Sequence, residues 1–125
     1  MIVDKNRCRV WKEFSFEAAH SLPDDRIGKP NERLHGHSYM ARVYVEGEIN
    51  SDTGMVAHMN AMEDAVRVVK FRFDHNNLNE VMEHTQPTME RIAELIAVMF
   101  PILGVVRVEV WRPTLACGAI WERLP

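Results

Sequence analysis

The sequence lacks the features that mark several common classes of protein. No apolar run approaches the roughly 18 residues that a membrane-spanning helix needs, and residues 1–9 lack the continuous apolar core of a signal peptide. The net charge of -3 provides no basic excess for binding nucleic acid or an anionic membrane. These absences predict a cytoplasmic protein whose partners are small molecules, with no nucleic-acid or membrane partner.

Cysteine is also scarce. Cys8 and Cys117 are too few for a disulfide framework, and neither belongs to a Cys-x-x-Cys pair of the kind that binds metal through thiolates. We therefore expect both to be reduced and to be small buried apolar side chains. No repeat or low-complexity tract divides the 125 residues, which suit a single domain.

Hydrophobic periodicity predicts an α+β domain with an antiparallel sheet. Apolar and charged residues alternate along the early strands, and β-branched residues are concentrated near the C-terminus. Between them, apolar residues recur at helical spacing after two candidate N-caps, Asn60 and Thr88. The predicted ββααββ order is strand 8–20, strand 37–48, helix 60–71, helix 88–100, strand 105–112 and strand 119–124.

Two polar segments are predicted to be loops. Residues 21–34 form a connection long enough to be functional, and it leads directly into a pair of histidines. Its cations, Arg26, Lys29 and Arg33, suit a phosphate-bearing substrate but suit solvent equally well. Residues 74–87, before the second helix, are predicted to be the other loop.

Three histidines are placed to converge. His35 and His37 are two residues apart at the start of a strand, so both imidazoles lie on one face. His20 follows the apolar side of the preceding strand and can face the same interior. A lone histidine there is more often a hydrogen-bonded core residue. Three imidazoles and an open position instead describe a catalytic zinc site, so we expect Zn²⁺ as the cofactor.

The dipeptide Asp74-His75 is a second candidate for chemistry. A carboxylate beside a histidine can orient the imidazole and raise its basicity for proton transfer. The alternative is a polar loop in which Asp74 caps backbone amides. The dipeptide by itself leaves both interpretations open.

Five segments, taken in order, resemble the 6-pyruvoyltetrahydropterin synthase and 6-carboxytetrahydropterin synthase family. They are FSFEAAH (14–20), LHGHSY (34–39), TGMV (53–56), DHNNLN (74–79) and PTME (87–90). The resemblance implies one such domain over 1–125 with a tunnelling fold (T-fold). In that fold, ββααββ subunits join their strands around a barrel, usually as a homo-oligomer that is a dimer of trimers.

The same resemblance implies an activity and a set of site residues. Family members act on the side chain of dihydroneopterin compounds, usually the triphosphate, and a 6-carboxytetrahydropterin synthase-like lyase would serve queuosine precursor synthesis. The implied positions are His20, His35 and His37 for zinc, Asp74 and His75 for a proton relay, and Thr88, Glu90 and Arg112 for the substrate.

The chain departs from the family pattern near the first histidine of His-Gly-His. Asn31 stands where a catalytic cysteine is common, and an amide cannot become an anionic base. Glu32 occupies the place of a glutamate that a subgroup carries instead, and that subgroup resembles enzymes that shorten the side chain to a hydroxymethyl group. We therefore expect Glu32 to be the catalytic base, the alternative being an exposed loop carboxylate.

Two further departures lie elsewhere. Arg112 stands where a glutamate usually anchors the amino-pyrimidine edge of the pterin, and a guanidinium offers donors only. His58 stands where an aspartate is common. A non-catalytic paralogue that binds zinc or a ligand is accordingly the alternative to the lyase.

Overall fold

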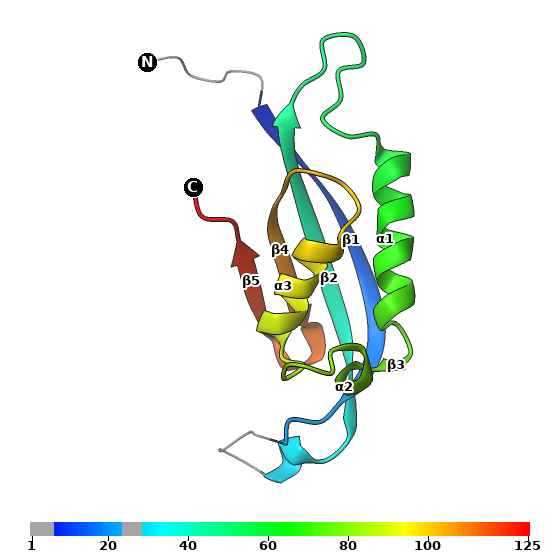
Figure 1. Ribbon diagram of the computed structural model, residues 1–125, viewed down its shortest axis with the longest axis vertical. Helices are drawn as coiled ribbons and strands as arrows, with labels where there is room; N and C mark the ends of the chain where they lie inside the picture. The colour runs from blue at the N-terminus through cyan, green and yellow to red at the C-terminus, as the bar shows by residue number, and fades with distance from the viewer. Residues whose placement is uncertain (1–6, 24–28) are drawn as a thin grey trace.

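The computed structural model describes residues 7–23 and 29–125, so the loop cation Arg26 lies outside the described residues. One five-stranded sheet with the order β3-β1-β2-β4-β5 carries its helices on one face (Figure 1). Its elements are β1 (Arg7–His20), a 3-10 turn (Lys29–Glu32), β2 (His35–Glu48), α1 (Met59–Phe73), β3 (Asn76–Asn77), α2 (Leu78–Val81), α3 (Met89–Met99), β4 (Val105–Arg112), a second 3-10 turn (Pro113–Leu115) and β5 (Cys117–Glu122).

The antiparallel pair β1 and β2 forms the centre of the sheet. Its register runs from Arg7 opposite Glu48 to His20 opposite His35, without interruption. Alternate residues of both strands are buried on the face toward the helices, as the period of two requires. The predicted strands are therefore confirmed, and β2 begins at His35, two residues earlier than expected.

The helices cover that apolar face. In Figure 1, α1 runs alongside β1 while α3 lies across β4 and β5, and both helices contact those strands. The core consists of residues from both layers, with α1 and α3 contributing Met62, Ala65, Val66, Val69, Phe73, Ile92, Ala93 and Ile96. Within the described part of the chain, no helix is both long enough and apolar enough to cross a membrane.

The cap of α1 corrects one expectation. The helix begins at Met59, and the residue that caps it is His58. The Nδ1 atom of His58 accepts a hydrogen bond from the backbone amide of Asn60 at 3.1 Å. An imidazole lone pair satisfies the free amide just as the predicted asparagine oxygen would, and this gives His58 a structural role.

The segment 74–87 is less irregular than predicted. It contains β3, which pairs in parallel with β1 at Ala18 and Ala19, and the single turn of α2. The Asn77 side chain caps α2 by accepting from the amide of Asn79. A two-residue strand and a one-turn helix are too short to show a hydrophobic period. The sheet is therefore mixed at this edge, although the ββααββ frame holds.

The C-terminal hairpin corrects two more expectations. The chain reverses through Pro113–Leu115 and a left-handed Ala116 (φ 51°), so β5 begins at Cys117 and not at 119. Cys117 and Cys8 are both exposed, so the expectation that they are buried was wrong. Both lie near the ends of strands, where neither helix covers them.

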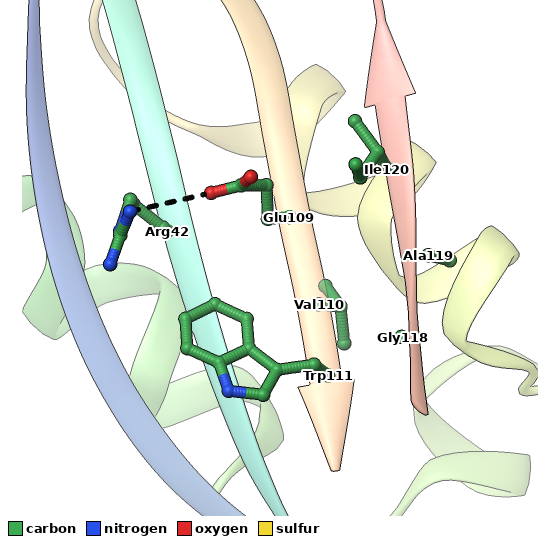
Figure 2. Close-up of a pocket in the computed structure, with 7 residues that line it drawn as sticks. All are labelled: Arg42, Glu109, Val110, Trp111, Gly118, Ala119 and Ile120. Atoms are coloured by element: carbon green, nitrogen blue, oxygen red, sulfur yellow. Dashed lines mark ion pairs between the residues drawn. The ribbon is translucent and has the colours of Figure 1, made fainter. Parts of the chain in front are cut away.

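The face of the sheet away from the helices carries paired charges. A hollow of about 410 Å³ lies there, and Figure 2 shows Arg42 joined to Glu109 beside the indole of Trp111. The Arg42 guanidinium lies 4.4 Å from the ring centroid of Trp11 and forms a 2.6 Å ion pair with Glu13. These cross-strand contacts order the bare face of the sheet without assembling reactive groups.

Two glycines with positive φ provide a test of this packing. A Cβ on Gly104 (φ 94°) would lie 2.6 Å from the carbonyl oxygen of Glu46, whereas one on Gly54 (φ 72°) would meet nothing within 4 Å. We expect Gly54→Ala to cost about 1 kcal/mol of unfolding free energy from backbone strain alone. Gly104→Ala should cost about 3 kcal/mol or more, because the clash adds to the strain.

Urea unfolding of the two variants measures this difference. Equal midpoints for Gly54→Ala and Gly104→Ala would contradict the close approach of the 99–104 segment to β2.

Candidate metal centre

Three histidines converge at the end of the long strand pair. His20 closes β1 and lies directly opposite His35, the first residue of β2, while His37 follows on the same face. The ring centroids lie 4.6 Å apart for His20 and His35, 5.0 Å for His20 and His37, and 4.8 Å for His35 and His37. Their possible ligand atoms all lie within 4.8 Å of one another. The predicted convergence is thus observed.

Backbone carbonyls fix the orientation of two of these rings. Nδ1 of His20 donates to the carbonyl oxygen of Pro87 at 2.8 Å, and Nδ1 of His35 donates to that of Arg33 at 2.7 Å. Because a carbonyl only accepts, the proton sits on Nδ1 and the lone pair on Nε2. Nε2 of His20 is buried with no partner among the described residues. Metal-binding histidines in proteins show the same arrangement.

The surroundings of His20 and His37 favour the neutral form of these two imidazoles. Burial lowers the pKa of His20, and the nearby charges of His35 and Arg112 lower it further against the raising effect of the Pro87 carbonyl. Burial also lowers the pKa of His37 to about 4, again assisted by Arg112. A histidine must be neutral to bind a metal, so the donor set fits a divalent cation that accepts nitrogen ligands.

Arg112 lies against this centre from β4. Its Nη1 donates to Nε2 of His37 at 3.1 Å, and its Nε is buried without a partner among the described residues. The hydroxyl of Tyr39, two residues beyond His37, is likewise buried and unpartnered. Burial raises the pKa of Tyr39 to about 12, so this hydroxyl keeps its proton. Two donors without acceptors therefore adjoin the histidines.

A pocket of about 240 Å³ opens beside the histidines. It brings together the three residues expected to contact the substrate, Thr88, Glu90 and Arg112. Thr88 also caps α3 by accepting from the amide of Arg91, which fixes the first turn of the helix at the pocket. The residues that line it are His20, Leu22, Asn31, His35, Thr88, Met89, Glu90 and Arg112.

Glu32 lies next to the pocket and not in its lining. It ends the 3-10 turn as an exposed residue, while its neighbour Asn31 contributes to the pocket wall. The carbonyl of Asn31 accepts from the amide of Leu22 at 2.7 Å, which joins the two sides of the long loop. The Glu32 carboxylate is therefore not part of the lining that includes His20 and His35.

Asp74 makes both contacts that the sequence allowed: it lies against the His75 ring and it accepts a hydrogen bond from a backbone amide. One Asp74 oxygen accepts from the amide of Glu17 at 2.8 Å, and the other lies 2.9 Å from Nδ1 of His75. The Glu17 amide is the main cause of the lowered pKa of Asp74, with the His75 hydrogen bond adding to it. The His75 side chain is 79% exposed.

This pair does not meet the three histidines within one chain. His75 lies beside β3, and it lines a separate hollow of about 480 Å³ that includes His37 but neither His20 nor His35. The backbone of His75 is left-handed (φ 58°), held by a 2.6 Å hydrogen bond from its amide to the Glu17 carbonyl.

Sequence reasoning missed several residues that position the site. The Asn79 side chain accepts from the Ser21 amide at 2.8 Å and donates to the Ser21 carbonyl at 2.9 Å, which fixes the chain just after His20. No local pattern indicates that contact. Tyr39 was discoverable, because the period of two places it on the same strand face as His37.

Comparisons with known proteins agree with this geometry. The profile of the family described as 6-pyruvoyl tetrahydropterin synthase matches residues 9–123. The chain is 42% identical over 101 residues to a 6-carboxy-5,6,7,8-tetrahydropterin synthase from Synechocystis sp., covering 77% of each chain. It is 37% identical over 87 residues to a dihydroneopterin monophosphate aldolase from Pyrococcus furiosus, covering 70% of this chain and 69% of the aldolase.

Solved structures share the fold at lower sequence identity. The 6-pyruvoyl tetrahydropterin synthase of Caenorhabditis elegans superposes with a TM-score of 0.79 at 20% identity, covering 98% of this chain and 100% of the other. That of Plasmodium falciparum gives a TM-score of 0.74 at 17% identity, covering 97% and 100%. The subunit therefore has the predicted tunnelling fold, and the chain belongs to the 6-pyruvoyl tetrahydropterin synthase family.

Proposed function

We propose that the chain is a zinc-dependent lyase that cleaves the side chain of a dihydropterin, with the metal on His20, His35 and His37. The observation that carries the proposal is the convergence of three histidines, two of which line a pocket, with no fourth protein ligand among the described residues. Three imidazoles with an open position suit catalytic zinc. Relatives named as pterin synthases and a pterin aldolase support the substrate class.

The residues of the chain would divide the work. Bound zinc would supply a Lewis acid that polarises the side-chain hydroxyls of the substrate. The carbonyls of Pro87 and Arg33 hold two imidazoles in the binding orientation before any ligand arrives. The Asp74 carboxylate would orient the exposed His75 ring, whose Nδ1 lies 2.9 Å from one of its oxygens, for a proton relay.

Two products remain candidates. A 6-carboxytetrahydropterin synthase activity, which would supply queuosine precursors from dihydroneopterin triphosphate, is favoured by the Synechocystis relative. Cleavage of dihydroneopterin to 6-hydroxymethyl-dihydropterin is favoured by Glu32 and by the Pyrococcus aldolase. Structures of the Plasmodium vivax synthase, described as catalytic residue mutants, replace a glutamate with cysteine or alanine. A paralogue that only binds zinc or a ligand is the remaining alternative.

Zinc binding is tested first. We expect about one zinc per chain in the purified protein, and a large loss of zinc in His35→Ala, because only two imidazoles then remain. Elemental analysis measures both. The matched control is His84→Ala, whose side chain is 92% exposed and away from the triad. Full zinc content in His35→Ala would remove this residue from the site.

The second prediction concerns Glu32 as the general base. A general base contributes about a hundredfold to ten-thousandfold in rate, so Glu32→Gln should lower turnover of dihydroneopterin compounds by that order. Zinc content should stay unchanged, because Glu32 is not among the metal-binding group. Chromatography of the products measures the rate.

Two controls sharpen that experiment. Asn31→Ala should change turnover much less, since its amide cannot titrate. Glu83→Gln removes an exposed carboxylate that pairs with His84, away from the pocket, and should leave the rate unchanged. If Glu32→Gln retains the wild-type rate within a few-fold, the base lies elsewhere.

We also propose that the chain works as a homo-oligomer, a dimer of trimers. Among the described residues, β3 covers only Ala18 and Ala19 of β1, and the outer edge of β5 has no neighbour. Unpaired edges favour pairing with another chain. We expect sedimentation equilibrium at micromolar concentration to give the mass of six chains, and a monomer alone would contradict the assembly.

A further inference from the structure

We propose that Arg112 selects a ligand by receiving an acidic group, a phosphate monoester or a carboxylate, directly beside the three histidines. This inference rests on the proposed function, because it names the substrate class of the same pocket. Three observations support it: Arg112 lines the pocket, its buried Nε has no partner among the described residues, and its Nη1 contacts His37.

Arg112 has more hydrogen-bond donors than the described residues satisfy. A guanidinium carries five donors and no acceptor, and it stays charged in proteins. Its Nε is buried and has no partner among the described residues. A buried charged donor without an acceptor is costly, so such groups are normally satisfied by a partner, water or a ligand. Because Arg112 lines the pocket, a ligand there can supply an acceptor to its guanidinium group.

Arg112 also contacts His37. Nη1 of Arg112 donates to Nε2 of His37, which requires the single lone pair of a neutral imidazole. A metal on His37 takes that same lone pair, whichever ring nitrogen it uses. The guanidinium then loses this acceptor as well. Metal loading therefore leaves Nη1 of Arg112 in need of a new acceptor beside the metal.

The pocket is lined by charges of both signs. Arg112 enters from the end of β4, and Glu90 enters from the first turn of α3. A carboxylate accepts hydrogen bonds while a guanidinium donates them, so the two suit a ligand with a donor edge and an acidic group. The unpartnered Tyr39 hydroxyl adds another donor near Arg112. Within the pocket itself, an oxyanion is the ligand group that suits the Arg112 guanidinium.

Calorimetry on the zinc-loaded full chain tests the inference. The probes are dihydroneopterin, dihydroneopterin monophosphate and 6-carboxypterin, together with inorganic phosphate. We expect the wild type to bind at least one of the two acidic pterins roughly tenfold to a hundredfold more tightly than dihydroneopterin, the range for hydrogen bonds to a charged group. Arg112→Gln should remove that preference. Arg112→Lys keeps the positive charge but lacks the paired donors of a guanidinium, so it should retain part of the preference.

The controls distinguish a phosphate from a carboxylate, and they show whether a variant has lost binding because it is misfolded. Arg91→Gln removes an α3 arginine that pairs with Glu94 and does not line the pocket, so it should behave as the wild type. A preference for the monophosphate alone assigns a phosphate, and one for 6-carboxypterin alone assigns a carboxylate. Zinc content and sedimentation of each variant establish that it is folded.

The outcomes separate this inference from the proposed function. An Arg112-dependent preference without turnover of any dihydropterin would support the inference and overturn the lyase. Turnover with no preference for an acidic ligand, or with a preference that Arg112→Gln leaves within about twofold, would overturn the inference and leave the lyase standing.

Discussion

The register of the β1 and β2 pair is the constraint on which the rest of the structure depends. It places His20 opposite His35 and puts both, with His37, on the face that also carries the core. A slip of one residue would turn every side chain of one strand to the other face. The same slip would expose either Phe16 on β1 or Tyr39 on β2, and so break a stacked pair whose ring centroids lie 5.0 Å apart. Core burial therefore specifies the geometry of the metal centre.

The site also depends on elements outside that pair. The Pro87 carbonyl, just before α3, holds His20, so the packing of α3 on the sheet and the orientation of a metal ligand are coupled. The carbonyl of Arg33 does the same for His35 from the end of the long loop. The orientation of His20 and His35 is thus fixed by backbone atoms, whereas His37 contacts the Arg112 side chain.

The positive charge of Arg112 beside the three histidines distinguishes this chain from the family pattern, which usually has a glutamate at that position. Arg112 places a permanent cation beside imidazoles that must stay neutral, and it helps to lower the pKa of His37 to about 4. A positive charge beside a metal repels a second cation and attracts an anion. The substitution of a donor for an acceptor at this position therefore alters which ligands the pocket can hold while leaving the three converging histidines in place.

The sequence by itself determined the ββααββ frame and the convergence of three histidines, because both follow from periods of two and 3.6 that neighbouring residues reveal. It could not reveal β3, the His58 cap or the exposed cysteines, since these depend on short segments and strand ends. Only the tertiary structure decided that Arg112 reaches His37, 75 residues away along the chain. It also decided that His75 shares a hollow with His37 but not with His20 or His35. Contacts between distant residues depend on how layers pack, which no local pattern encodes.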